Sequence, residues 1–530
     1  MNRFKFATVT TMVFSALIFV STLTAQTPKP VRTDAGPVQG SVENGITIYK
    51  GIPFAAPPLG DLRWRAPKPA APWKDVLQAD KFAPACMQVP VVMPALGLDA
   101  LTVNEDCLYL NVWTPAKMPK DKLAVMVWIY GGGFTIGGTS LAQYDGRNLA
   151  KKGVMLVSIA YRLGALGFLA SPELSAEQGG HSGNYGLMDQ IAGLQWVKKN
   201  IAAFGGDPNR VTIFGESAGG IAVSMLAASP LAKGLFTGAI SESGGSFAPP
   251  RLGNEGGENV PPLAVAERNG TAFLAKLGAS SIGDARKKSA DEILKSSAPG
   301  LGGSWPNFDG YVLLGDQYKL YEASHFNDTP ILIGTNADEG ALFVPSITAA
   351  AYESNVRAGF ADYADKILAA YPAGSDAEAL RSARDLQRDS LFAWSTWSWA
   401  RLQSKTGKGK TYVYYFSHRP QYPDAPQFKS WGAAHGSEIA FVFGNFAAAM
   451  PATDADKRVS DEVSSYWVNF AKAGDPNGSA LPAWPAFTDA NQQVMNLNDP
   501  SKAIPAPNLE KLQVLDGYYA WRRSQAATKP

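Results

Sequence analysis

The chain carries little excess charge and few side chains that act as bases or thiols. Of its 530 residues, 48 are Lys or Arg and 46 are Asp or Glu, while only four are His and two are Cys. A net charge of +2 gives no reason to expect nucleic acid or an anionic membrane as a partner, because both attract clustered basic residues. Any chemistry that needs an imidazole must therefore use one of four histidines.

The N-terminal segment lacks the uninterrupted apolar run of about 20 residues that a membrane-spanning helix requires. Its apolar run covers residues 12–20 and follows Arg3 and Lys5 without an acidic residue. This pattern is typical of a signal peptide over residues 1–25, cleaved after Ala25 or within a few residues of it, because Leu23 is larger than the usual small residue there. Its removal takes the formal charge from +2 to 0. A retained membrane anchor is the alternative, which the short run disfavours. We expect an exported protein, periplasmic or secreted, with no stable membrane anchor.

Internal repeats and low-complexity linkers are also missing. Residues 26–530 could make three or more domains on length alone. The motifs described below extend over most of this stretch, and no linker divides it. The sequence therefore predicts one large domain and leaves the oligomeric state open.

Residues 204–220, FGGDPNRVTIFGESAGG, join a short apolar strand to a helix of small residues. Between the two lies a G-x-S-x-G centred on Ser217. In a nucleophile elbow the turn strains the serine backbone and exposes the hydroxyl above a sheet, and the glycines avoid collisions with the adjoining strand and helix. The pentapeptide alone can arise by chance, but a strand before it and a helix after it favour an elbow. Ser217 is the predicted nucleophile.

A serine nucleophile needs a base, and chain order narrows the choice. In α/β-hydrolases the order is Ser, acid, His, which excludes His181. His325 is predicted on a surface helix, and His418 at the end of a strand. His435 lies in a loop of small residues ahead of an apolar segment, where it can reach a serine. His435 is the predicted base.

The acid is expected directly after the apolar strand Ile331–Ile333, because catalytic acids lie where strand ends and loops converge. Asp338 and Glu339 are adjacent there. Composition does not choose between them, and a solvated acidic turn is the simpler interpretation of such a pair.

Three glycines, residues 131–133, follow the apolar strand 123–130. Glycines allow backbone N–H groups to approach a ligand oxygen. A glycine loop at this point supplies one donor of the oxyanion hole in α/β-hydrolases, and the residue after the nucleophile, here Ala218, supplies another. Tyr130 stands where the commoner motif has His. A triple glycine can also be a flexible loop, but its position after a buried strand favours the oxyanion role.

With these motifs the chain resembles the type-B carboxylesterases, the group that includes cholinesterases, bacterial nitrobenzyl-ester esterases and some fungal lipases. The similarity covers most of the chain after the signal peptide. Besides the elbow, it rests on residues 105–115 (EDCLYLNVWTP), 51–58 (GIPFAAPP), 62–64 (LRW) and 184–190 (NYGLMDQ).

The resemblance implies an α/β-hydrolase fold and a Ser-His-Glu triad. It assigns Glu339, rather than Asp338, as the acid beside Ser217 and His435. It places the oxyanion donors on Gly132, Gly133 and Ala218.

Cys86 and Cys107 are the two cysteines, and in an exported chain a disulfide between them is the default. The loop ends lie 21 positions apart, and the bond is worth roughly 3 kcal/mol in the chain-entropy model. The resembled family has a disulfide here, around a loop at the mouth of the active-site gorge. In cholinesterases that loop carries a tryptophan that binds quaternary ammonium. Residues 87–106 contain no aromatic residue, so a choline ester is not the expected substrate.

The apolar pattern predicts an α/β fold: a central, mostly parallel sheet flanked by helices, with a helical cap. The expected strands are 125–130, 154–160, 211–214, 237–241, 331–334, 412–415 and 494–497. Helices are expected over about 186–204 and 461–472, the second ended by Gly474 and carrying an aromatic stripe that fits the core. Residues 247–307 and 345–405 are expected to form the cap.

These parts predict an enzyme that cleaves small-molecule carboxylic esters through an acyl-serine intermediate and needs no metal or organic cofactor. Ser243, after a strand, either hydrogen-bonds near the acid or is a buried structural serine. The alternatives are a lipase acting at an oil–water interface and a catalytically silent adhesion homologue; the intact triad and glycine loop disfavour the second.

Two predictions concern solution conditions. Because His435 must be neutral, kcat/KM is expected to rise through an apparent pKa near about 6.5, modified by its Glu partner. Reduction of the disulfide is expected to lower thermal stability and at most to raise KM, and to leave kcat close to its original value.

Overall fold

The computed structural model describes residues 28–90, 99–251, 260–297 and 304–528. The predicted signal peptide, residues 1–25, lies outside the described residues, and so do short parts of the disulfide loop and of the expected cap. Within the described residues, no helix is long and apolar enough to cross a membrane.

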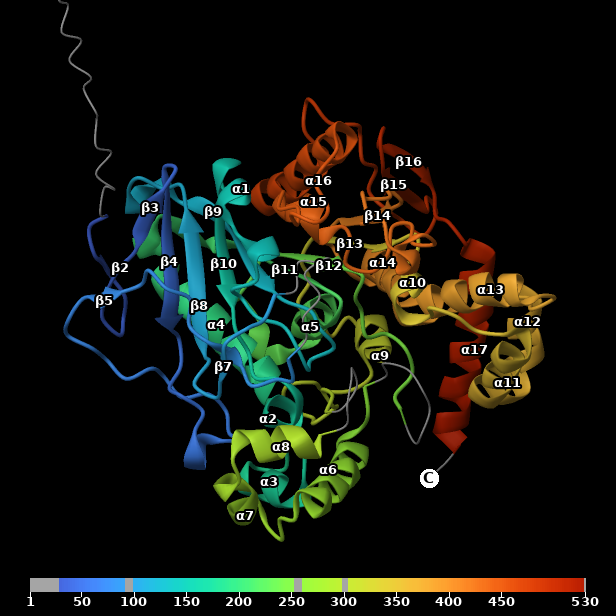
Figure 1. Cartoon of the computed structure of the whole chain (residues 1–530), viewed down its shortest axis with the longest axis horizontal. Helices are drawn as coiled ribbons and strands as arrows, with labels where there is room; N and C mark the ends of the chain where they lie inside the picture. Colours follow the sequence, from blue (N-terminus) through green and yellow to red (C-terminus); the bar gives the residue numbers. More distant parts are fainter. Residues whose placement is uncertain (1–27, 91–98, 252–259, 298–303, 529–530) are drawn as a thin grey trace, which may run out of the picture.

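A sheet of eleven strands in the described residues organises the molecule (Figure 1). Its spatial order is β16-β15-β14-β13-β12-β11-β9-β10-β8-β4-β3. In chain order its strands are β3 (Ser41–Glu43), β4 (Ile46–Pro53), β8 (Tyr109–Thr114), β9 (Leu123–Ile129), β10 (Met155–Ile159), β11 (Gly206–Glu216), β12 (Gly238–Glu242), β13 (Ile331–Asn336), β14 (Thr411–Phe416), β15 (Gln493–Leu497) and β16 (Lys502–Pro505). Six neighbouring pairs are parallel, from β10·β9 to β14·β15, and the outer pairs are antiparallel.

The seven expected strands are all present as β9 to β15, which confirms the predicted mostly parallel sheet. Their side chains are buried on both faces, as the continuous apolar runs indicate. The antiparallel strands at the two ends of the sheet were not predicted. Two smaller sheets hold β1 (Val31–Arg32), β2 (Pro37–Gln39) and β5 (Leu77–Gln78), and β6 (Ala85–Cys86) with β7 (Val103–Asn104).

Some helices pack on the sheet, and others lie farther from it (Figure 1). Those that contact the sheet include α1 (Arg147–Lys151), α4 (Tyr185–Asn200), α5 (Ala218–Ala228), α14 (Trp394–Thr406) and α16 (Asp454–Ala473). The others are α2 (Gly164–Phe168), α3 (Pro172–Glu177), α6 (Leu263–Leu277), α7 (Ile282–Lys287), α8 (Ala290–Ser296), α9 (Gln317–Glu322), α10 (Gly340–Phe343), α11 (Ala349–Phe360), α12 (Ala364–Ala370), α13 (Asp376–Arg388), α15 (Ile439–Phe443) and α17 (Leu509–Thr528).

Three local expectations are wrong. Helix α16 begins at Asp454, seven residues before the predicted start, because Thr453 and Asp456 form a capping box there. Helix α14 was assigned to the cap but packs on β13 and β14, burying Trp394 and Trp399. His325 lies in an exposed turn after α9 rather than on a helix.

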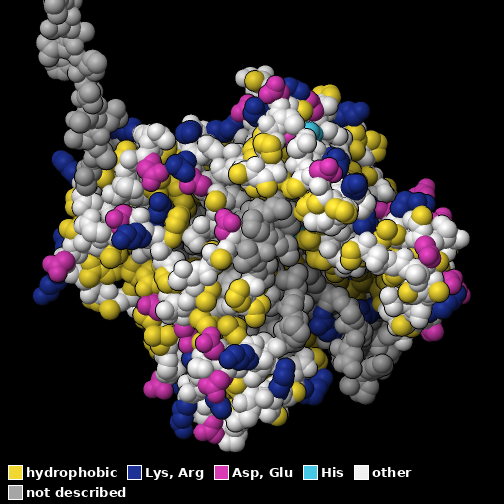
Figure 2. Space-filling model, in the orientation of Figure 1, with side chains coloured by type: hydrophobic (Ala, Val, Ile, Leu, Met, Phe, Trp, Pro, Cys, Tyr) yellow, Lys and Arg dark blue, Asp and Glu magenta, His cyan; other side chains and the backbone are white. Residues whose placement is uncertain are grey.

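The surface agrees with the near-neutral composition. Over the described part of the face in Figure 2, basic and acidic side chains are mixed, without a broad area of one sign.

Candidate active site

Ser217 lies at the sharp turn between β11 and α5. Its backbone has φ 55° and ψ −123°, a conformation that non-glycine residues rarely adopt. The turn is tight because a Cβ at Gly215 or Gly219 would lie 2.5 or 2.0 Å from the carbonyl oxygen of Ile129. The N–H of Ser217 donates to the carbonyl of Glu242, 2.9 Å away, which fixes the elbow to the next strand. The turn has the geometry expected of a nucleophile elbow.

Glu339 follows β13 and lies against His435. Its Oε2 is 2.5 Å from Nδ1 of His435, and both side chains are buried. Its Oε1 accepts two more hydrogen bonds, from the Ser243 hydroxyl at 2.5 Å and the Asn336 N–H at 2.7 Å. Three contacts thus hold one carboxylate in one orientation, and Ser243 makes the hydrogen bond near the acid that the sequence left open.

Asp338 has a different position from its neighbour. It is exposed, and its Oδ2 accepts the N–H of Ala433 at 2.9 Å. Asp338 therefore supports the backbone of the loop that carries His435, while Glu339 contacts the imidazole itself.

The His435 ring is held between aromatic side chains and carboxylates. Phe392, in the π-helical segment η8 (Asp389–Ala393), stacks on it with centroids 4.6 Å apart, and Phe343 lies at 5.1 Å. Its Nε2 is 3.2 Å from Oε1 of Glu216, the residue before Ser217. The second ring nitrogen therefore faces the elbow, while the first is occupied by Glu339.

Four buried glutamates belong to this region: Glu216, Glu339 and Glu438 act on the histidine, and Glu242 acts on Glu438 and Glu216. Burial, with the nearby charges of Glu216 and Glu339, raises the pKa of Glu438 to about 8. Burial and Glu438 hold the pKa of Glu242 well above its usual range. Burial thus favours the neutral form of both carboxyls, which reduces the negative charge at the site.

The same cluster acts on the histidine. Burial alone would lower the pKa of His435, but Glu216 and Glu339 outweigh it and raise this pKa to about 10. The shift is upward from an ordinary value near 6.5, the direction in which a Glu partner modifies the pKa of a histidine. The imidazolium form is stabilised at this site.

Sequence reasoning missed Glu216, Glu242 and Glu438 as members of the site. Each stands beside a motif residue: Glu216 before Ser217, Glu242 before Ser243, and Glu438 three residues after His435. Asn336 joins two of the segments, because its amide donates to the Ala434 carbonyl at 2.9 Å and also to Glu438.

The glycine loop lies on the other side of the elbow. A Cβ at Gly131 would be 3.1 Å from Cβ of Ser217, so the loop passes directly against the serine. Gly132 and Gly133 have φ of 99° and 59°, which favour glycine. Within the described chain, neither of their N–H groups donates to a protein acceptor. These donors are available to a ligand oxygen beside Ser217.

Cys86 and Cys107 form the predicted disulfide, with Cα atoms 5.0 Å apart. Both residues are buried. The bond joins β6 to the segment before β8, next to the glycine loop rather than on the far side of the molecule.

Comparison with known proteins gives a consistent result. A family model described as "Carboxylesterase family" matches residues 27–515. The fumonisin B1 esterase of Sphingopyxis macrogoltabida is 38% identical over 483 residues, covering 87% of this chain and 85% of that protein. The para-nitrobenzyl esterase of Bacillus subtilis is 36% identical over 495 residues, covering 92% and 98%. A solved structure of a PNB esterase superposes with a TM-score of 0.79 at 35% identity, over 92% of this chain and 99% of that one.

Proposed function

The chain belongs to the carboxylesterase family and is a carboxylic ester hydrolase, and from this premise we propose that it works through Ser217, His435 and Glu339 by way of an acyl-serine. One observation carries the proposal: the 2.5 Å contact between Glu339 and Nδ1 of His435 leaves Nε2 facing the elbow that holds Ser217.

His435 accepts the hydroxyl proton of Ser217 as its oxygen attacks the ester carbonyl. Glu339 holds the tautomer with the proton on Nδ1 and stabilises the imidazolium that forms. Glu216, 3.2 Å from Nε2, adds to this stabilisation. The imidazolium then gives its proton to the leaving alcohol, and a water molecule, activated by the same histidine, releases the acid.

The oxyanion is bound by the N–H groups of Gly132, Gly133 and Ala218. Each donor contributes about 3 kcal/mol to transition-state stabilisation if it resembles measured oxyanion donors. The positions of Gly131 against Ser217 and of Ala218 as the first residue of α5 support this arrangement.

The substrates are small organic esters. Two relatives, a fumonisin B1 esterase and a para-nitrobenzyl esterase, are named for quite different substrates. The enclosed disulfide segment, residues 87–106, has no aromatic residue to bind a quaternary ammonium, which disfavours choline esters. Export by a signal peptide over residues 1–25 is part of the same proposal.

A fluorophosphonate probe and nitrophenyl esters of graded chain length test the assignment together. Ser217→Ala should lose labelling and hydrolysis with an unchanged circular dichroism spectrum, since alanine fits the elbow. Ser524→Ala, at an exposed serine of α17, is the matched control. Hydrolysis by Ser217→Ala within tenfold of wild type would contradict the proposed nucleophile.

A further inference from the structure

One side-chain amide binds both backbone polar groups of a residue in the glycine loop. Nε2 of Gln88 donates to the Gly137 carbonyl at 2.6 Å, and the Gly137 N–H donates to Oε1 of Gln88 at 2.8 Å. Nε2 also donates to the Cys86 carbonyl at 3.0 Å. The Gln88 side chain is buried. Its amide therefore pairs with the N–H and the carbonyl of Gly137, as a residue of a neighbouring β-strand does.

Gly137 in turn lies against the start of the loop. Its φ is 120°, and a Cβ there would be 2.5 Å from the Tyr130 ring and 2.9 Å from the Gly131 carbonyl oxygen. The Gly132 carbonyl accepts the N–H groups of Thr135 and Ile136 at 3.0 and 3.1 Å, closing the turn between the two ends. Any shift of Gly137 is thus transmitted to residues 131–133.

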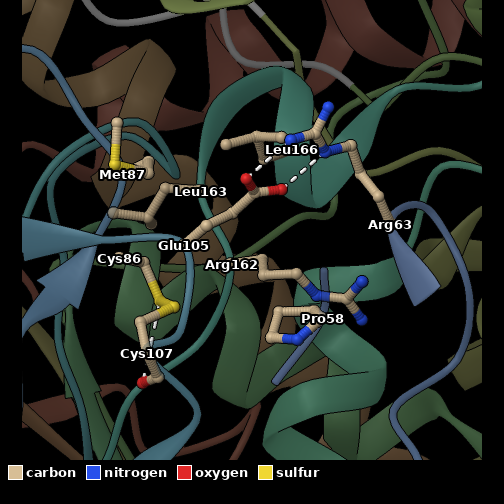
Figure 3. Close-up of a pocket in the computed structure, with 9 residues that line it drawn as sticks. All are labelled: Pro58, Arg63, Cys86, Met87, Glu105, Cys107, Arg162, Leu163 and Leu166. Carbon is tan, nitrogen blue, oxygen red and sulfur yellow. Dashed lines mark hydrogen bonds and ion pairs between the residues drawn. A yellow bond between two sulfur atoms is a disulfide. The ribbon is translucent and has the colours of Figure 1, made fainter. Parts of the chain in front are cut away.

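The segment that carries Gln88 is held firmly. Cys86 is bonded to Cys107, and Arg63 binds Glu105 through two nitrogens at 2.5 and 2.6 Å (Figure 3). The cavity between these groups is about 10 Å³, room for about one water molecule. The far side of the loop is fixed as well, because a Cβ at Gly138 would be 3.0 to 3.1 Å from Leu101 and Ala85. Gln88 therefore connects the disulfide-anchored end of this segment to the glycine loop.

We infer that Gln88 is a positioning residue for the N–H groups of Gly132 and Gly133, and that the Cys86–Cys107 segment acts on catalysis through it. The inference rests on the proposed oxyanion role of that loop. It departs from the expectation that the disulfide affects stability and leaves kcat unchanged. Oxyanion donors act on a charge that exists only in the transition state, so their displacement lowers kcat and leaves KM nearly constant.

The test uses Gln88→Met, which keeps the size of the side chain and removes its hydrogen bonds, and Gln88→Glu, which cannot donate to the Gly137 and Cys86 carbonyls. Gln39→Met is the matched control, because Gln39 lies in β2 of the small sheet and donates to the Pro28 carbonyl, away from the glycine loop (Figure 1). We expect kcat on a nitrophenyl ester to fall about tenfold to a hundredfold in both Gln88 variants, with KM within threefold of wild type. Affinity for a trifluoromethyl ketone, which forms an oxyanion on the serine, should fall in parallel with kcat.

A purely structural role would lower the melting temperature without separating kcat from KM. A folded Gln88→Met enzyme with kcat within twofold of wild type overturns the inference. If neither Gln88 variant folds, mild reduction of the wild-type protein is the second test: kcat should fall once two thiols titrate, and an unchanged kcat overturns the inference. Failure of the proposed function is distinguishable, because Ser217→Ala would then remain active.

Discussion

The two sides of the active site differ in the chemical groups that form them. On the side of β11 to β13 and the His435 loop, four glutamates are buried, and three of them (Glu216, Glu339 and Glu438) raise the pKa of one imidazole. On the other side, residues 131–138 (GGGFTIGG) contain no ionisable side chain and are held by backbone bonds, the Gln88 amide and Tyr161, whose hydroxyl donates to the Tyr130 carbonyl at 2.8 Å. In the proposed mechanism the first side handles protons and depends on charge. The second side would bind the oxyanion with neutral donors and depend on geometry.

This difference determines which substitutions and pH changes each side of the site tolerates. A buried charge cluster responds to pH and to any change in the number of carboxylates, because its members shift one another's pKa values. A loop of neutral N–H donors does not titrate in the working range. Variants on the two sides should therefore differ in their pH profiles and not only in their rates.

The largest effect is expected at the acid on the charged side. Glu339→Gln removes the charge that faces Nδ1 and allows the wrong imidazole tautomer, so kcat should fall by roughly 10⁴. Asp338→Asn is the control, expected within a few-fold of wild type because that side chain is exposed and accepts a backbone N–H that an asparagine oxygen can also accept. Steady-state kinetics of the two variants check this, and the reverse ranking would show that the acid is misassigned.

Ser243→Ala should give the next largest loss. It removes a 2.5 Å hydrogen bond to the Glu339 carboxylate, and bonds to charged groups are worth about 1.5–3 kcal/mol, which corresponds to about tenfold to a hundredfold in kcat. The control is Ser224→Ala, another buried serine, whose hydroxyl donates to the Ile221 carbonyl at 2.7 Å. Equal rates in the two variants would contradict a role for Ser243 in orienting the acid.

Glu216→Gln should change the pH dependence more than the rate at its optimum. His435 must be neutral to accept a proton, and the carboxylates raise its pKa above 6.5, so kcat/KM of the wild type should rise with pH through an apparent pKa above that value. Removing one carboxylate lowers the pKa of His435, and the rising limb should move to lower pH. Profiles of kcat/KM between pH 5 and 10 measure the shift. Glu177→Gln, at an exposed glutamate, is the control. If the apparent pKa of the rising part of the profile is the same in Glu216→Gln as in this control, the role of Glu216 is contradicted.

The smallest effect is expected on the neutral side. Tyr161→Phe removes the hydroxyl that binds the Tyr130 carbonyl, one neutral hydrogen bond worth about 1 kcal/mol, and kcat should fall about fivefold. The apparent pKa of the rising part of the kcat/KM–pH profile should not change. A shifted limb would show that the two sides of the site are not electrostatically separate.

The sequence predicts the centre of this fold better than its margins. Strands β9 to β15 are apolar runs that must be buried wherever the chain folds, so pattern alone finds them. The edge strands β3 and β16 are short and have no fully buried residue, so they leave little pattern to detect. Helix α14 has the apolar content of a cap segment, and only its packing on β13 and β14 distinguishes it from one.

The residues of the site also differ in how well the sequence predicts them. Ser217, His435 and the glycine loop each stand in a local motif, whereas the choice of Glu339 over Asp338 needed the family resemblance. Glu216, Glu242, Glu438 and Gln88 are polar residues that look like ordinary surface positions in the sequence. Their roles come from the approach of segments far apart in the chain, such as residue 88 with 137 and residue 336 with 438. No local pattern records such pairs.

The absence of Cβ atoms around the elbow has a consequence for sequence variation. Side chains at positions 131, 215, 219, 220 and 244 would each point at backbone atoms of a neighbouring segment, less than 3 Å away. In a library of all single substitutions selected for esterase activity, only glycine should be recovered at these five positions. Position 283, where the nearest atom is 3.6 Å away, should accept many residues. Such a map would outline the elbow without reference to any charged or nucleophilic side chain.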